Sequence, residues 1–175
     1  MLEFDSKGSF VSSFGHLISK ENDTKASATH QAYMPFIHGN ENYLVTATQF
    51  GEIIEIYDLS NKTQTNLVGK KAYPKFQEVK NMAINAGIMG FEDIFTTTNY
   101  IYALFNGENV NERDINRQGG KYIYVFNFDG KPIMKLILNR YATSLFVDDN
   151  DNTMYLLDVN TDEPLFTLAL NDVLE

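Results

Sequence analysis

One run that is apolar on both of its faces constrains the fold of this chain most strongly. Residues 122–128 are Tyr-Ile-Tyr-Val-Phe-Asn-Phe. Because successive side chains of a strand point to opposite faces, the four aromatic side chains share one face, and Ile123 and Val125 lie on the other. Such a strand must be covered on both sides. In an antiparallel protein this predicts sheets stacked on either side, as in a sandwich or a propeller.

The rest of the chain is also dominated by short β-rich runs separated by turn residues. Three further runs of strand length are rich in β-branched and aromatic residues, namely 43–48, 52–57 and 100–105. Residues 74–86 are compatible with a short helix, although their apolar spacing is brief. The sequence therefore predicts an all-β protein.

A weak internal repeat favours the propeller over the sandwich. An apolar strand runs into Asp5, Asp58 or Asp129, then Gly or Asn, then Lys, then a second strand. Such residues suit tight hairpins, and their intervals are roughly those of propeller blades. We expect a single partial β-propeller domain over 1–175 with four-stranded antiparallel blades. The predicted divisions are the end of one blade at 1–14, full blades at 31–70 and 88–138, and a partial blade at 142–170.

Residues 100–170 resemble the C-terminal half of the TolB-like six-bladed β-propellers of Bacteroides-type bacteria. The matching segments are Tyr-Ile-Tyr-Ala-Leu-Phe-Asn-Gly at 100–107, Ile-Tyr-Val-Phe-Asn-Phe-Asp-Gly-Lys-Pro-Ile at 123–133, Phe-Val-Asp-Asp at 146–149 and Met-Tyr-Leu-Leu at 154–157. Residues 1–70 agree more loosely. The resemblance implies a chain about half the family's usual length, placed in the periplasm or at the cell surface. It implies no particular activity.

Composition excludes several classes of function. The chain has no cysteine, so disulfides, Cys-based zinc sites and thiol catalysis are excluded. Its net charge of −9 argues against nucleic acid as a partner, because phosphate binding depends on concentrated Lys and Arg. No apolar run reaches the ~18–20 residues of a membrane span. The acidic start of the chain is not typical of a signal peptide.

No motif for a metal site, a cofactor or a hydrolase is complete in this sequence. Asp148–Asn152 offers oxygen ligands for Ca²⁺, but Thr153 stands where an EF-hand needs Gly, so a turn is favoured. The histidines form no HxH or HExxH pair, although two of them flank one loop; they are His16, His30 and His38. No G-x-S-x-G or phosphate-loop spacing occurs. We predict no metal site, no cofactor and no catalytic residue.

The polar segment between the strands at 100–105 and 122–128 is the best candidate for a site. It joins them by about fourteen residues where a hairpin needs two to five, and loops of that length are often functional. It carries Glu112, Arg113, Asp114 and Arg117, which we predict to be ligand-binding residues. The two arginines suit an anionic group. A solvated insertion without function is the alternative.

Two functions from different classes follow from these features. The preferred one is a non-catalytic binding or scaffold module of the bacterial cell envelope, with a protein or glycan partner. The alternative is a lyase or hydrolase acting on a small-molecule or sugar substrate at a central propeller pocket.

If the chain is half of a propeller, we expect it to assemble with further blades. An incomplete ring would expose an apolar blade face and unpaired strand edges. We therefore expect a homodimer that closes one ring, or an N-terminal half that this chain lacks. A further alternative is that hairpin 1–14 folds back to complete the blade at 142–170. The long loops 17–29, 71–84 and 107–120 are expected on one face of the propeller.

Overall fold

The structure is a computed structural model of residues 1–175, and it describes residues 1–16, 18, 36–71, 73, 75–79, 82–114, 116–148, 150 and 152–170. These residues form strands and turns, and none of them lies in a helix. The all-β class predicted from the sequence is confirmed.

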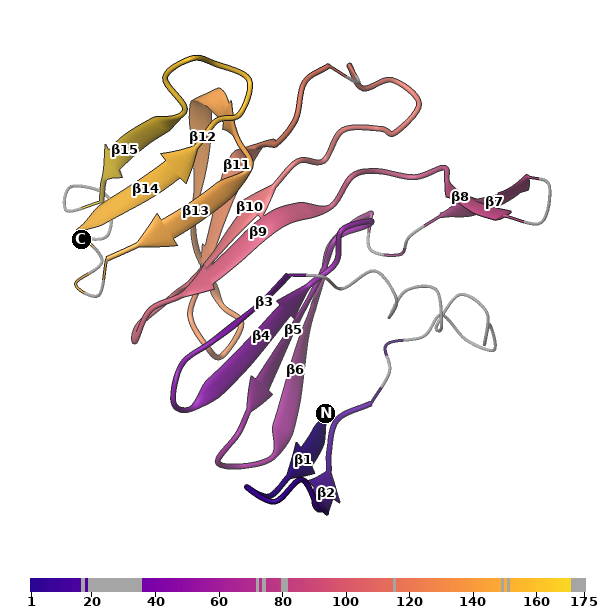
Figure 1. Ribbon diagram of the computed structural model, residues 1–175, viewed down its shortest axis with the longest axis vertical. Coiled ribbons are helices and arrows are strands. Elements are labelled where there is room, and N and C mark those ends of the chain that lie inside the picture. The colour runs from indigo at the N-terminus through magenta and orange to yellow at the C-terminus, as the bar shows by residue number, and fades with distance from the viewer. Residues whose placement is uncertain are drawn as a thin grey trace.

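Strands follow one another along the described chain and are joined by turns and loops (Figure 1). Their bounds are β1 Leu2–Phe4, β2 Phe10–Ser13, β3 Phe36–Gly39, β4 Tyr43–Ala47, β5 Ile53–Asp58, β6 Thr63–Val68, β7 Phe76–Val79, β8 Met82–Asn85, β9 Phe91–Thr96, β10 Ile101–Phe105, β11 Gly120–Phe126, β12 Pro132–Ala142, β13 Ser144–Val147, β14 Thr153–Leu157 and β15 Leu165–Ala169.

Two antiparallel four-stranded sheets, each a meander, form the body of the molecule. Their strand orders are β3-β4-β5-β6 and β9-β10-β11-β12, and a three-stranded sheet follows with the order β13-β14-β15. The strands of the two larger sheets start inside the ranges 31–70 and 88–138, although β12 runs on to Ala142. Their interpretation as blades of one partial propeller domain stays a prediction.

The middle sheet β9–β12 is covered on both faces, as the alternation in residues 122–128 predicted. Ile123 and Val125 are fully buried in a cluster with side chains of β13, β14 and the segment after β15. Tyr122 and Tyr124 lie on the other face, among side chains that pack against the sheet β3–β6. Two adjoining cores therefore stack three sheets in chain order, which agrees with the arrangement of propeller blades.

The first strands of the three sheets adjoin one another. Strand β9 contacts both β3 and β13, and it lies between the other two sheets in Figure 1. In a propeller, the first strand of each blade lines the central axis. By this arrangement β3, β9 and β13 are the inner strands, and β6 and β12 are the outer ones.

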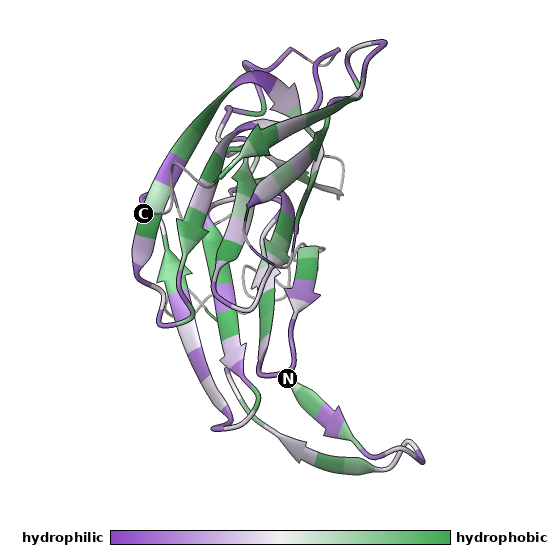
Figure 2. Cartoon of the chain, turned by 90° about the vertical axis from the view of Figure 1, so that its left-hand side faces the viewer, coloured by the Kyte–Doolittle hydropathy of each residue, from purple (hydrophilic) through white to green (hydrophobic). Residues whose placement is uncertain are grey.

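Long connections and tight turns lie at opposite ends of the sheets. Figure 1 shows segment 106–119 and the β7–β8 hairpin leaving the sheets on the same side, and turn 59–62 lying at the other end. Figure 2 shows hydrophobic residues along the strands and hydrophilic residues at turns and loops. Two of the three loops expected on one face are thus placed together. The third, at 17–29, lies almost wholly outside the described residues.

Two alternatives that the sequence left open are not found in the described residues. Strands β7 and β8 pair antiparallel where a short helix was compatible with the sequence, because their cross-strand pairing outweighs a brief helical pattern. The hairpin 1–14 does not complete the last blade, since β1 and β2 pair with each other and β13–β15 remains three-stranded. Instead the hairpin lies by the first large sheet, where Lys62 Nζ donates to Glu3 Oε2 at 2.7 Å.

Candidate functional site

The predicted ligand-binding segment 106–121 forms a loop at residues 106–119, before β11, and this loop is held by the segment that precedes β9. Met89 N–H donates to the carbonyl of Glu108 at 2.8 Å, and Gly107 N–H donates back to Met89 at 3.1 Å. Val110 N–H reaches the carbonyl of Gly87 at 3.0 Å. The first third of the loop is therefore fixed like a short extra strand pair, so its position relative to the inner strand β9 is defined.

Asn106 fixes both ends of the loop from a buried position. Its Nδ2 donates to the carbonyl of Gly119 at 2.7 Å and to Glu92 Oε1 at 2.8 Å. Its Oδ1 accepts the N–H of Glu108 at 2.9 Å. Because one buried amide joins the first residue of the loop to the last, the loop closes tightly despite its length.

The four predicted residues occupy two turns at the tip of the loop. Arg113 N–H donates to the carbonyl of Asn109 at 3.0 Å, and Arg117 N–H donates to that of Asp114 at 3.0 Å. The side chains of Glu112, Asp114 and Arg117 are exposed, and that of Arg113 is half-buried. The local turns thus present two cations and two carboxylates from a fixed backbone.

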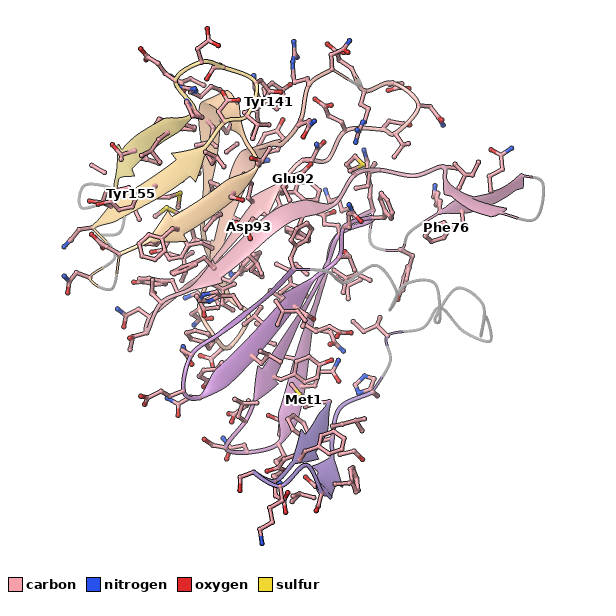
Figure 3. All side chains as sticks on the ribbon, in the orientation of Figure 1. Met1, Phe76, Glu92, Asp93, Tyr141 and Tyr155 are labelled. Carbon is pink, nitrogen blue, oxygen red and sulfur yellow. The ribbon has the colours of Figure 1, made fainter. Side chains whose placement is uncertain are left out.

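The side chain of Tyr141 contacts two cations, Arg117 and Lys121. Arg117 Nη1 donates to the Tyr141 hydroxyl at 3.2 Å, and that hydroxyl donates to Glu108 Oε1 at 3.1 Å. The guanidinium lies 4.9 Å from the ring centroid of Tyr141, and the ammonium of Lys121 lies 4.7 Å from it. Two cations therefore share one aromatic ring. Figure 3 shows Tyr141 on the same side of the molecule as the loop.

The loop is also tied to the connection between β14 and β15. Gln118 N–H donates to Asn160 Oδ1 and Asn160 Nδ2 donates back to the carbonyl of Gln118, both at 2.9 Å. That connection is itself held by Arg140, whose Nε donates to the buried Asp158 at 3.0 Å. The loop is thus supported by three different parts of the chain.

Glu92 links the loop to the inner strand β9. Burial raises the pKa of the Glu92 carboxyl, and its hydrogen bond from Asn106 and the positive charge of Arg113 partly offset this rise. Of the four predicted residues, Arg113 is the one that acts electrostatically on an inner-strand acid. Glu112, Asp114 and Arg117 are placed at the outer tip.

Asp93, next to Glu92, faces a different set of partners (Figure 3). Its Oδ2 accepts the N–H of Leu145 at 2.9 Å, and its Oδ1 accepts the N–H of Ile94 at 2.9 Å. Burial raises its pKa, and these hydrogen bonds and the charge of His38 oppose the rise. Among the described residues Glu92 and Asp93 share no hydrogen-bond partner, so the inner strand carries two separate acids.

The other sequence candidates are not brought together. His38 lies on β3, where its Nδ1 accepts the N–H of Thr96 at 3.0 Å. His16 lies near Asn66 by the outer strand β6, and His30 lies outside the described residues. Asp148 closes a turn with Asn152 N–H, as expected for a β-turn. Within the described residues no three His, Asp or Glu side chains gather as a ligand set.

The sequence did not indicate four further residues of the site. Glu108, Lys121, Tyr141 and Asn160 complete the site, yet they come from segments up to about fifty residues apart in the sequence. The excess of polar residues in 158–164 was a signal for the last of them. Tyr141 carried none, because an aromatic residue in a strand usually packs in the core.

Antiparallel four-stranded sheets stacked around neighbouring inner strands, with long loops at one end, define a protein of the β-propeller class. A profile described as TolB-like 6-blade propeller-like matches residues 2–150. The chain belongs to this family, and the family indicates at most a binding or scaffold role.

Other comparisons add little. No curated protein matches this chain. A chain of the solved structure described as "Crystal Structure of Mitotic Checkpoint Complex" is similar at 12% identity and a TM-score of 0.28, over 73% of this chain and 57% of the other. The chain thus spans little more than half of that match. None of the described segments forms a helix long and apolar enough to cross a membrane.

Proposed function

We propose that this chain is a non-catalytic binding module of the bacterial cell envelope and that loop 106–119 carries its ligand site. The observation behind this proposal is the fixed loop itself, which is held by the segment before β9, by Tyr141 and by Asn160. Long loops held by a rigid scaffold are where binding residues concentrate. The periplasm or the cell surface is the proposed location, on the basis of the family.

The chemistry of the loop favours a partner that carries anionic and hydroxyl groups. Arg113, Arg117 and Lys121 supply positive charge in a chain whose net charge is −9, and a guanidinium suits a carboxylate because it donates two parallel hydrogen bonds. Glu112 and Asp114 supply exposed acceptors for hydroxyl groups. An acidic glycan, free or on a glycoprotein, fits this combination.

The test is binding of the purified chain to an array of acidic and neutral glycans. We expect retention on acidic members, lost in the double variant Arg113→Ala/Arg117→Ala. The charge-matched control is Lys7→Ala/Lys131→Ala, which removes two exposed lysines from turns at the other end of the sheets. Equal loss in both double variants would show a general charge effect and contradict a site at the loop.

We further propose that two copies associate. The face of β13–β15 that points away from β9–β12 is exposed and apolar, with Phe146, Tyr155, Leu157 and Leu165 on it. In a closed propeller another blade covers such a face. In two copies arranged head to tail about a two-fold axis, each copy would cover this face of the other, and together they would close one ring.

The second candidate is a lyase or hydrolase, and one observation favours it. Glu92 and Asp93 are adjacent, half-buried acids on an inner strand, and burial raises the pKa of both. If they act on a sugar, Glu92→Gln and Asp93→Asn would each abolish release of reducing ends from an acidic polysaccharide. Activity that survives both substitutions would exclude this mechanism.

A further inference from the structure

A groove with a volume of about 640 Å³ lies between the outer parts of the two four-stranded sheets. Residues 66–69 at the end of β6 line one side, and residues 132–135 of β12 line the other. Its floor is formed by Ile54 and Phe91, which are 1% and 2% exposed. The floor is therefore closed by packed side chains, and the groove opens only outward.

Both ends of the groove are shaped by glycines. Gly130, at a φ of +80°, lets the β11–β12 turn approach β6, because a Cβ there would lie 2.6 Å from Cδ2 of Leu67. Beyond the other end of β6, Gly69 makes room for the side chain of Glu52, since a Cβ at Gly69 would overlap the carboxyl. The turn closes one end of the groove, and a carboxylate marks the other.

The rim of the groove is apolar on both sides. Leu67, which shares the face of Ile54, lines it from β6, and Ile133, which is 40% exposed, lines it from β12. Ligand pockets usually have volumes of ~300–1,000 Å³, mainly apolar walls and a few polar groups. Apolar side chains on both sides of an open groove, one of them exposed, are typical of a docking site.

The two charged side chains that line the groove, Lys135 and Glu52, differ in their contacts. Lys135 lies over two aromatic rings, 4.1 Å from the centroid of Tyr122 and 5.3 Å from that of Tyr124. Glu52 forms no salt bridge with any described residue, and its carboxylate accepts only the N–H of Lys71, at 3.3 Å. After burial, the charge of Glu52 is the next cause of the raised pKa of Tyr124, so it acts on the wall of the groove. No cation of the described residues neutralises this carboxylate, so it can bind a cation of a partner.

Strand β6 also offers its backbone. It pairs with β5 on one side only and is an edge strand within the described sheet. An edge strand presents unpaired N–H and C=O groups, to which an extended peptide can add as a further strand. Strand β12 is less suited, because Pro132 lacks an N–H at the groove.

We propose that this groove binds an extended, mainly apolar peptide segment of a partner protein. The segment pairs with the free edge of β6 and places alternate apolar side chains between Leu67 and Ile133. A Lys or Arg of the segment meets the carboxylate of Glu52. This site is separate from loop 106–119 and does not depend on the function proposed for that loop.

The experiment measures fluorescence anisotropy with a set of labelled, capped heptapeptides in which Val, Ile, Leu or Phe alternates with Thr and one terminal Thr is replaced by Arg. We expect at least one of them to bind with a Kd below about 1 mM. Methylation of alternate backbone nitrogens on the pairing side should abolish binding, because it removes the donors that pair with β6. If none of the peptides binds, or if the methylated peptide binds equally well, the proposal is wrong.

Three variants test whether the peptide binds in the groove. Ile133→Glu should weaken it about tenfold or more, since it puts a charge at the apolar rim. Glu52→Gln should remove the preference for Arg over Thr at the charged position. Ile137→Glu is the matched control, because Ile137 lies on the same strand, is 72% exposed and does not line the groove. Equal weakening by Ile133→Glu and Ile137→Glu would contradict a site in the groove.

Discussion

The carboxylate of Asp93 on β9 accepts the backbone N–H of Leu145 on β13 at 2.9 Å and so joins the inner strands of two neighbouring sheets. β9 and β13 belong to different sheets, so no ladder hydrogen bonds connect them. This side chain therefore links the second and third sheets near the axis, beside the ring contact of Phe95 with Phe146.

Replacement of Asp93 by Ala should destabilise the protein by about 1–3 kcal/mol, because the N–H groups of Leu145 and Ile94 lose their acceptor. The raised pKa of Asp93 gives this effect a pH dependence. The contribution of a group with a raised folded-state pKa is fully present below the unfolded value of 3.8 and falls as the pH rises through the folded value. In urea denaturation the loss should thus be larger near about pH 4 than near about pH 7. A loss that grows with pH would contradict the raised pKa, and exposed Asp162→Ala is the control.

His38 should give the opposite pH dependence. Burial lowers its pKa, and its Nδ1 accepts the N–H of Thr96, so the folded protein favours the neutral ring. Stability is then lost as the pH falls from about 6.5 toward the lowered folded-state pKa. In His38→Ala this loss should disappear from denaturation curves recorded between about pH 7 and pH 5. His16→Ala should leave it in place. An unchanged pH profile in His38→Ala would disprove the assignment.

Tyr57→Phe should destabilise the protein by about 1–3 kcal/mol. The hydroxyl of Tyr57 donates to Oε2 of the buried Glu55 at 2.6 Å, and Oε1 of Glu55 has no hydrogen-bond partner among the described residues. Loss of the donor leaves that carboxylate with only a 3.4 Å contact from Thr46 among the described hydrogen bonds of its side chain. Tyr155→Phe, at an exposed tyrosine, is the matched control and should change the melting temperature little. Equal effects would show that the hydroxyl of Tyr57 does not contribute.

We expect Arg140 to stabilise the fold, and Arg113 and Arg117 to contribute little to stability. Arg140→Ala removes the partner of the buried Asp158 and should cost about 3 kcal/mol or more, since an unpaired buried charge remains. Arg113→Ala/Arg117→Ala should change stability by less than about 0.5 kcal/mol, as expected near the surface. Thermal unfolding of the three proteins checks this order. A large loss in the double variant would make the loop arginines structural.

Sedimentation velocity at tens of micromolar should show twice the monomer mass if two copies cover the faces of β13–β15. Phe146→Glu/Leu165→Glu should shift the protein to monomer, because both side chains lie on the exposed apolar face. Ile84→Glu, at an exposed residue of the β7–β8 hairpin, should leave the dimer intact. A clean monomer of the unmodified chain would contradict the dimer and weaken the interpretation of the chain as half a ring.

The sequence alone determined the elements that depend on local pattern. Alternation in residues 122–128 predicted a strand covered on both faces, and Ile123 and Val125 are indeed fully buried opposite the aromatic face. The turn residues at Asp5, Asp58 and Asp129 predicted hairpins that the structure contains. Such features are visible in a sequence because each depends on residues a few positions apart.

Only the tertiary structure decided which distant side chains meet. Arg117 and Lys121 share the ring of Tyr141, and Glu92 reaches Asn106, because the bulge and register of β9–β12 bring these positions to one end of the sheet. The groove beside Glu52 is lined by residues 66–69 and 132–135, which are far apart in the sequence and meet only in the fold. A shift of one residue in either register would turn these side chains to the opposite face, and local sequence patterns do not fix how one sheet packs on the next.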